Sequence, residues 1–138
     1  MANQILIVED SGPETRLMSV MFEEVDPFCS LSMASSDESA LRLLETGVIP
    51  DLTLVDLNIP TGGAPQFIER LRQLPGMKNQ PVVVLSNVAA PEQIRACYDR
   101  GADAYVQKPS TLEDLELLVR RMCSFWLRAK TRTVSGRQ

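Results

Sequence analysis

Five short apolar segments, separated by stretches with helical spacing, constrain most strongly what this chain can fold into. They are ILIV at 5–8, LSMAS at 31–35, LTLV at 52–55, VVVL at 82–85 and AYV at 104–106. Three of them are continuously apolar, which is typical of strands covered on both faces in a parallel sheet. With 138 residues, 44% of them hydrophobic, the chain can form a single domain with its own core.

Helix boundary signals lie between these segments. We expect helices that begin near Pro13 with a Ser11–Glu14 capping box, end at Gly47, end at Pro75–Gly76, run from Pro91 to Gly101, and begin with a Ser110–Glu113 capping box. Regular alternation of strand and helix predicts right-handed crossovers. The expected fold class is therefore α/β, with a doubly wound, five-stranded parallel sheet and helices on both faces.

Polar residues follow the predicted strands, at the sheet edge where ligands bind in such folds. They are Glu9 and Asp10 after the first strand, Asp56 after the third, Ser86 after the fourth, and Lys108 and Pro109 after the fifth. Converging carboxylates repel one another unless a cation lies between them. Because Mg²⁺ prefers oxygen ligands, we expect a magnesium site formed by Asp10, Asp56 and a backbone carbonyl near Asn58. Glu9 would act through water.

Composition excludes several other kinds of site. The chain contains no histidine, so imidazole acid–base chemistry and histidine-ligated metals are excluded. Its three cysteines, Cys29, Cys97 and Cys123, are far apart in sequence and are expected to be reduced and packed. No apolar stretch approaches the roughly 18 residues that cross a bilayer, and the N-terminus lacks a signal-peptide pattern. A cytoplasmic protein without a membrane partner is expected.

Charge is distributed unevenly along the chain. All 18 acidic residues lie at or before Glu116, whereas 6 of the 14 basic residues follow it. The first part therefore carries 8 − 18 = −10 and the remainder +6. An acidic body repels nucleic acid, so direct DNA binding is not expected. The basic tail at 128–138 would be a solvated end or, alternatively, a contact for an acidic partner or for nucleic acid.

Four motifs together resemble the receiver domain of bacterial two-component response regulators. They are VED at 8–10, LVDLNIP at 54–60, VVVLS at 82–86 and GADAYVQKP at 101–109. The resemblance covers about residues 4–127, so a receiver domain at 1–127 followed by the tail is expected. It implies a flavodoxin-like fold with strand order 2-1-3-4-5.

The resemblance also implies roles for the residues at the strand ends. Asp56 would be the phosphoacceptor, Glu9 and Asp10 would help to hold magnesium, and Ser86 and Lys108 would bind the phosphoryl oxygens. The Lys108–Pro109 peptide bond would be cis, a geometry whose energetic cost is modest only before proline. Such a protein is not an enzyme in the usual sense. It takes part in its own phosphoryl transfer from a histidine kinase or phosphotransfer protein.

A packing switch is one hypothesis for how phosphorylation would be signalled. Movement of the Ser86 hydroxyl toward a phosphoryl group would vacate space that Tyr105 could fill by turning inward. The alternative is that Tyr105 is a half-buried strand residue without a switching role.

Two segments, PVVVLSN at 81–87 and SFWLRAK at 124–130, look like those of small stand-alone regulators that partner bacterial phytochrome histidine kinases. The resemblance implies a homodimer through the fourth helix, fifth strand, fifth helix and C-terminal extension. Candidate contacts are Tyr105, Phe125, Trp126 and Leu127. Alternatively, the Phe-Trp-Leu segment covers the end of the sheet within one subunit.

The sequence thus predicts a single-domain response regulator, phosphorylated on Asp56 in a magnesium-dependent reaction, that signals by protein contact. Two alternatives remain open: a receiver-like interaction module that is never phosphorylated, and a receiver fragment of a longer regulator. A nucleotide-binding protein would need a Gly-rich phosphate loop after the first strand, where the sequence is EDSGPE. An aspartyl phosphatase would need an Asp-x-Asp pair on the first strand, whereas the pattern here is Asp56-Leu57-Asn58 on the third.

Overall fold

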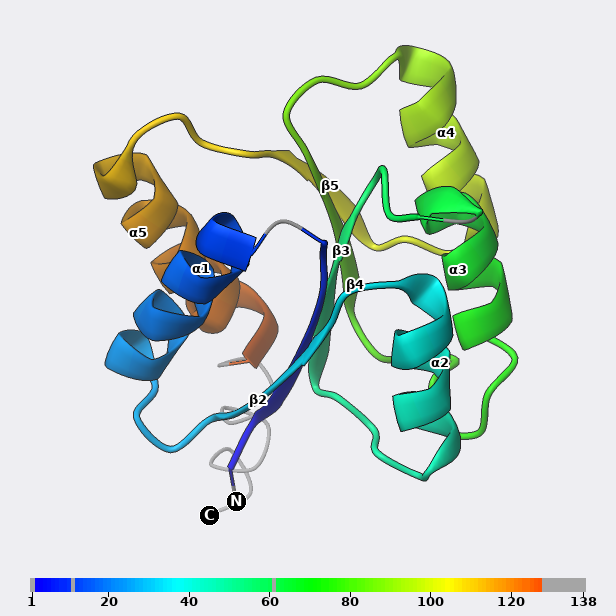
Figure 1. The fold of residues 1–138 in the computed structure, drawn as a ribbon, viewed down its shortest axis with the longest axis horizontal. Helices are drawn as coiled ribbons and strands as arrows, with labels where there is room; N and C mark the ends of the chain where they lie inside the picture. Colours follow the sequence, from blue (N-terminus) through cyan, green and yellow to red (C-terminus); the bar gives the residue numbers. More distant parts are fainter. Residues whose placement is uncertain (1, 11, 61, 128–138) are drawn as a thin grey trace.

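The computed structural model describes residues 2–10, 12–60 and 62–127, and strands and helices alternate along them (Figure 1). The elements in chain order are β1 (Gln4–Val8), α1 (Gly12–Val25), β2 (Ser30–Ala34), α2 (Asp37–Glu45), β3 (Leu52–Asp56), α3 (Gly63–Leu71), β4 (Val82–Ser86), α4 (Pro91–Arg100), β5 (Ala104–Gln107), α5 (Leu112–Met122) and the π-helix η1 (Cys123–Leu127). The five strands form one parallel sheet in the order β2-β1-β3-β4-β5. The predicted fold class and strand order are confirmed.

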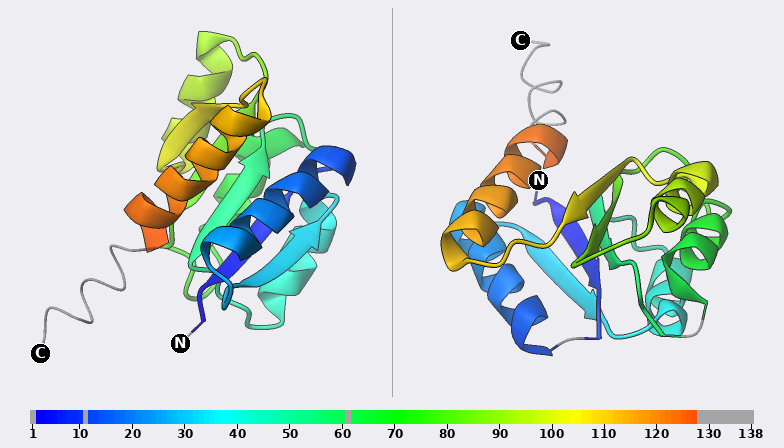
Figure 2. Two further views of the ribbon diagram at one scale, coloured as in Figure 1. Left: turned by 90° about the vertical axis from the view of Figure 1, so that its left-hand side faces the viewer. Right: turned by 90° about the horizontal axis from the view of Figure 1, so that it is seen from above.

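Helices cover both faces of the sheet, which explains why its central strands are continuously apolar. Helices α1 and α5 pack on one face, and α2, α3 and α4 on the other (Figures 1 and 2). Alternate residues of β1 point to opposite layers: Leu6 and Val8 join the core beneath α2–α4, whereas Ile5 and Ile7 join the core beneath α1 and α5. A strand with two buried faces has no solvent side, so most of its residues are apolar.

Helix boundaries follow most of the predicted signals. Helix α4 begins at Pro91 and ends at Arg100, and Gly101 caps it with a φ of +117° in the left-handed region. Helix α3 ends at Leu71, earlier than expected, because hydrogen bonds three residues apart carry the chain through tight turns to Leu74. Helix α5 is capped by Thr111, which accepts from the Asp114 amide at 3.1 Å, and not by Ser110.

Other sequence predictions fall partly or wholly outside the described residues. Ser11, the expected cap of α1, is not among the described residues, and neither is the basic tail at 128–138. Among the helices that are described, none is both long enough and apolar enough to cross a membrane.

The Phe-Trp-Leu segment lies in η1, and its three side chains differ in exposure. Phe125 is 66% exposed and makes an edge-on contact with Trp126, with ring centroids 4.7 Å apart. Trp126 is half-buried, whereas Leu127 is only 2% exposed and belongs to the core beneath α1 and α5. The expectation that Leu127 lies on a dimer surface is therefore wrong. The π-helical turn points it into its own subunit, where burial of its apolar side chain is favourable.

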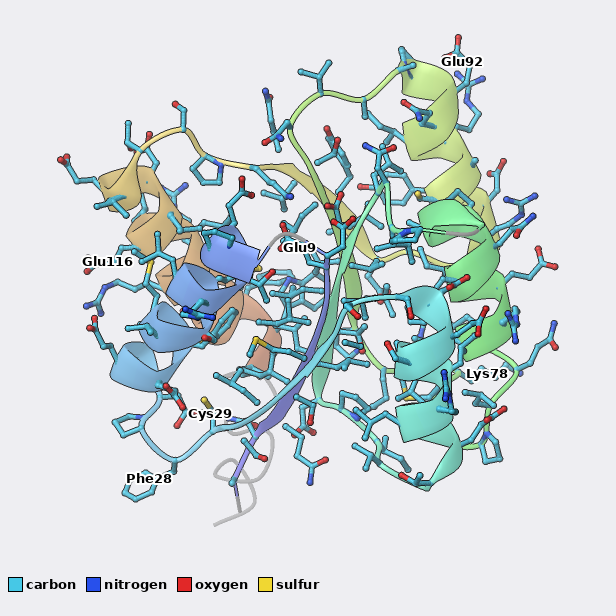
Figure 3. All side chains as sticks on the ribbon, viewed as in Figure 1. Glu9, Phe28, Cys29, Lys78, Glu92 and Glu116 are labelled. Carbon is cyan, nitrogen blue, oxygen red and sulfur yellow. The ribbon has the colours of Figure 1, made fainter. Side chains whose placement is uncertain are left out.

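The two ends of the sheet have different character. Glu9 lies at the carboxyl edge of the central strands, whereas Phe28 and Cys29 lie at the opposite end, before β2 (Figure 3). All three cysteines are free, as expected. Burial raises the pKa of each thiol, that of Cys123 to about 11, so a thiolate is a minor species at neutral pH.

A buried arginine ties α3 to the loops at the amino ends of β4 and β5. The guanidinium of Arg72 donates to the carbonyls of Gly101, Met77 and Gln80 at 2.6–3.2 Å. It also forms an ion pair with Asp103 at 3.0 Å. Asp103 in turn accepts from the Val82 amide that begins β4. One side chain thus satisfies three loop carbonyls that would otherwise lack partners.

Substitution Arg72→Met should lower the free energy of unfolding by about 2–4 kcal/mol, because it leaves these carbonyls and Asp103 without their cationic donor. Urea denaturation followed by circular dichroism would measure the change. The matched control Arg70→Met removes an exposed arginine from the same helix and should change stability by less than about 0.5 kcal/mol. Equal effects of the two substitutions would contradict the role assigned to Arg72.

Candidate functional site

Asp56 ends β3 at the carboxyl edge of the sheet, and the local chain orients its side chain. The Asn58 amide donates to Asp56 Oδ1 at 3.1 Å, and the Leu57 amide donates to the Leu85 carbonyl, which holds the loop against β4. The Asp56 side chain is 13% exposed. A carboxylate this enclosed requires a cation or several hydrogen bonds.

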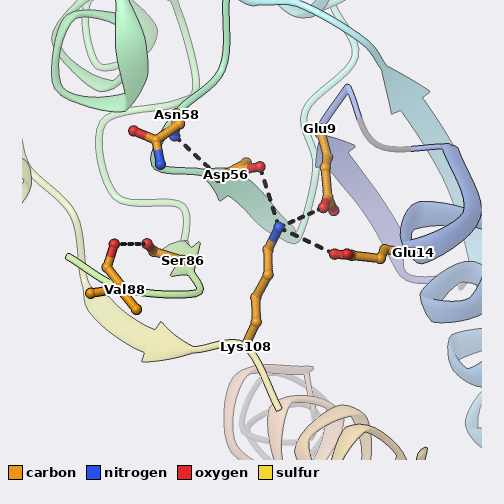
Figure 4. A network of polar contacts seen from close by, with 7 residues as sticks. All are labelled: Glu9, Glu14, Asp56, Asn58, Ser86, Val88 and Lys108. Carbon is orange, nitrogen blue, oxygen red and sulfur yellow. Dashed lines mark hydrogen bonds and ion pairs between the residues drawn. The ribbon is translucent and has the colours of Figure 1, made fainter. Parts of the chain in front are cut away.

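That cation is the ammonium of Lys108, which reaches back across the sheet edge from the chain after β5 (Figure 4). Lys108 Nζ lies 2.7 Å from Glu9 Oε1, 3.3 Å from Asp56 Oδ2 and 3.5 Å from Glu14 Oε2. Its backbone amide donates to the Ser86 carbonyl at 2.7 Å, which fixes the start of the side chain beside β4. The lysine therefore joins residues from β3, β4, α1 and the end of β1 at one point.

The pKa values of Glu9 and Lys108 reflect this enclosure. Burial raises the pKa of Glu9 above its ordinary value, and the hydrogen bond and charge of Lys108 offset only part of that effect. Burial alone would lower the pKa of Lys108, but the hydrogen bonds and charges of Glu9 and Asp56 outweigh it and raise the value. Lys108 therefore remains a cation throughout the physiological pH range.

Ser86 lies at the end of β4, next to β3, and is 1% exposed. Its hydroxyl donates to the Val88 carbonyl at 2.9 Å, on the side away from Lys108 (Figure 4). In this state the hydroxyl stabilises the loop after β4 rather than contacting Asp56. Engaging a group on Asp56 would require this hydrogen bond to be exchanged.

Tyr105 is half-buried on β5 and packs against the core beneath α2–α4. Its backbone amide donates to the hydroxyl of Tyr98, on α4, at 2.9 Å. Strand β5 is an edge strand, so this hydrogen bond satisfies an amide that no neighbouring strand reaches. The phenol of Tyr98 thereby attaches α4 to the edge of the sheet.

The expected magnesium ligands are partly assembled. Glu9 and Asp56 flank the ammonium of Lys108, whereas Asp10 is exposed at the start of the following loop and Asn58 is exposed beside Asp56. Within the described residues, no three acidic or cysteine side chains are arranged to hold a metal ion. The donor set nevertheless consists of carboxylate and carbonyl oxygens, the chemistry that Mg²⁺ prefers.

Comparison with known proteins identifies relatives of this chain. The sequence profile of the response regulator receiver domain matches residues 5–120. The chain belongs to that family. Response regulator Rcp1 of Synechocystis is 30% identical over 133 residues, which cover 92% of this chain and 90% of Rcp1.

Two solved structures extend the likeness to three dimensions. The phosphorylated cyanobacterial phytochrome response regulator RcpA superposes with a TM-score of 0.84 at 26% identity, covering 92% of this receiver and 95% of that chain. The Mn²⁺-bound form of Rcp1 superposes with a TM-score of 0.80 at 30% identity, covering 91% and 94%. The predicted resemblance to regulators of phytochrome signalling is confirmed at this level.

The receiver brings together three predicted residues, Glu9, Asp56 and Lys108, and places Ser86 on the adjacent strand. Sequence reasoning missed Glu14 as a partner of Lys108, because its spacing from Ser11 suggested only a helix cap. Its position in the first turn of α1, directly after a strand that ends at the site, was the available signal. Tyr98 was also missed, since no local pattern marks a side chain that bonds to an edge strand.

One prediction about the receiver is wrong in this structure. No peptide bond in the described part of the chain is cis, so the bond between Lys108 and Pro109 is trans. The trans form is the intrinsically favoured one, by about 0.5–1 kcal/mol before proline. The Lys108 side chain reaches Glu9 and Asp56 from it.

Substitution Lys108→Met should lower the free energy of unfolding by about 3–5 kcal/mol at pH 7, because it leaves Glu9 buried without a cation. Without Lys108 the pKa of Glu9 rises further, so the folded state binds a proton that the unfolded state releases above about 4.5. The variant should therefore lose stability as the pH rises from about 4.5 through the raised pKa of Glu9. Urea denaturation at pH 4.5 and 7 would measure this.

The exposed Lys78 offers a matched control for that experiment. Lys78→Met removes the same charge and should change stability by less than about 0.5 kcal/mol at either pH. If Lys108→Met were no more destabilising at pH 7 than at pH 4.5, Glu9 would not depend on Lys108 for its charged state.

Proposed function

We propose that this chain is a response regulator that accepts a phosphoryl group on Asp56 from a histidine kinase or phosphotransfer protein. The observation that carries the proposal is the convergence of Asp56, Glu9 and Lys108 at the carboxyl edge of the sheet. Membership of the receiver family supports it. The phytochrome regulator RcpA among the similar structures favours a phytochrome-type kinase as the donor.

The residues suit an in-line phosphoryl transfer. A carboxylate oxygen of Asp56 attacks the phosphorus of a donor phosphohistidine, the P–N bond breaks, and the histidine nitrogen keeps the bonding electron pair and takes up a proton. The product is an acyl phosphate on Asp56. The ammonium of Lys108, 3.3 Å from Asp56 Oδ2, is placed to bind an oxygen of the incoming group.

Magnesium is the proposed cofactor. Asp10, Asp56 and the Asn58 carbonyl would hold it, with Glu9 acting through water. The bound ion supplies positive charge that offsets the charge of the phosphoryl group. The Mn²⁺-bound form of Rcp1 among the similar structures supports a divalent ion in this fold.

Ser86 and Tyr105 form the proposed switch. Donation by the Ser86 hydroxyl to a phosphoryl oxygen would end its hydrogen bond with Val88 and release the loop before α4. Tyr105, which is half-buried on β5, would then turn inward. The output would be contact with another protein, made by a cytoplasmic receiver at 1–127 with a basic tail and without direct DNA binding.

Intact mass spectrometry after incubation with phosphoramidate and magnesium tests the phosphoacceptor. The wild-type protein should gain about 80 Da, one phosphoryl group, and Asp56→Asn should gain nothing. The control Asp99→Asn removes an exposed aspartate of α4 and should gain as much as wild type. Failure of wild type to gain mass from this donor and from a phosphorylated histidine kinase would favour the interaction module that is never phosphorylated.

We also infer a homodimer through α4, β5, α5 and the exposed ring of Phe125, with Tyr105 and Trp126 at its border. Phe125 is 66% exposed and contacts the neighbouring ring of Trp126, and aromatic side chains are enriched at interface centres. The basic tail lies outside the described residues, so its contribution is a separate question.

Sedimentation velocity over a range of concentrations tests the dimer. Phe125→Ser should weaken self-association at least about tenfold, because truncating a central aromatic typically costs 2 kcal/mol or more. The control Phe28→Ser alters a ring that is 82% exposed in the loop before β2 and should leave association unchanged. Equal association of Phe125→Ser and wild type would exclude this surface.

A further inference from the structure

Among the described residues, Glu14 is the partner of Lys108 that the proposed phosphoryl transfer does not use. It lies in the first turn of α1, and its Oε2 is 3.5 Å from Lys108 Nζ. Its side chain is 56% exposed, whereas that of Glu9 is 1% exposed. Glu14 is thus a solvent-facing anion attached to a buried cation.

The three carboxylates approach the ammonium from two sides (Figure 4). Glu9 and Glu14 come from the end of β1 and from α1, and Asp56 comes from β3. An ammonium has three N–H donors, so each carboxylate can accept one of them. In this state no donor is left for a further anion.

Binding an oxygen of a phosphoryl group on Asp56 therefore requires Lys108 to give up a partner. Ser86, the other proposed phosphoryl ligand, lies on β4, beyond β3 from Glu14. Movement of the ammonium toward that side lengthens its contact with Glu14, which is already the longest of the three. Glu9 is enclosed and cannot follow or leave, and Asp56 carries the group toward which the ammonium moves, so the contact with Glu14 is the one to be exchanged.

We propose that Glu14 is a positioning residue that holds the Lys108 ammonium on the α1 side of the site and releases it when Asp56 is phosphorylated. The contact stabilises the resting state more than the transfer state, so Glu14 slows the reaction. Glu14 also borders a cavity of about 390 Å³ between α1 and α5, with Lys108, Pro109 and Leu115 in its wall. The contact is consequently accessible from this cavity.

This inference rests on the proposed function, and two readouts keep the two separable. The first is the Lys108 side-chain amine signal in ¹⁵N NMR of the protein without any phosphoryl donor. Glu14→Gln should shift that signal and increase its exchange with water. The second is the initial rate of phosphorylation by phosphoramidate, which Glu14→Gln should raise about two- to fivefold, the range that an exposed ion pair contributes.

Two further variants show whether the position of the Glu14 carboxylate or only its charge is responsible for these changes. Glu14→Asp keeps the charge and the favourable interaction with the helix N-terminus but shortens the side chain by one methylene, so it should behave like Glu14→Gln. If only the overall charge mattered, Glu14→Asp would match wild type. Glu24→Gln removes an exposed glutamate further along α1 and should leave both readouts unchanged.

Each possible result tests a different part of the proposal. An unchanged Lys108 signal in Glu14→Gln would overturn the proposal whatever the rates are. A shifted signal with a rate equal to wild type would overturn the claim that Glu14 slows transfer. If wild type is not phosphorylated at all, the proposed function fails, and the NMR result still decides whether Glu14 positions Lys108.

Discussion

The site depends on one buried cation. Lys108 pairs with Glu9 and Asp56 at a place where neither carboxylate is well solvated, and its charge makes both tolerable. Desolvation still raises the pKa of Glu9, so the pairing compensates for only part of the penalty. Such a cluster is a poor source of stability but a ready means of binding a further anion, because its partners can be exchanged.

The parallel sheet makes this convergence possible. Every strand ends at the same edge, so residues separated by 99 positions, Glu9 and Lys108, meet at 2.7 Å. The layers of helices on both faces exclude water from the strands up to that edge. Polar side chains appear where this cover ends, and the site therefore forms at the boundary between a dry core and solvent.

Two hydroxyl groups connect this edge to the surface around α4 and β5. Ser86 holds the loop before α4 through Val88, and Tyr98 holds α4 to β5 through the Tyr105 amide. Both are single hydrogen bonds, each worth about 1 kcal/mol, in contrast to the several bonds of Arg72 at the other end of the sheet. Arg72 thus fixes the loops at the amino ends of β4 and β5 with several bonds, whereas α4 and the loop before it are attached to the sheet by these single hydrogen bonds.

Sequence alone determined the α/β class and the five strands, because buried strands are continuously apolar. It also indicated that Glu9, Asp56, Ser86 and Lys108 lie at one edge of the sheet, because the carboxyl ends of parallel strands share that edge. Tertiary structure decided what periodicity cannot encode. The partners of Lys108 include Glu14, which local spacing marked only as part of a helix cap, Leu127 turns inward while Phe125 does not, and the bond before Pro109 is trans. Each depends on distances between segments far apart in the chain, whereas sequence patterns report only local spacing and burial.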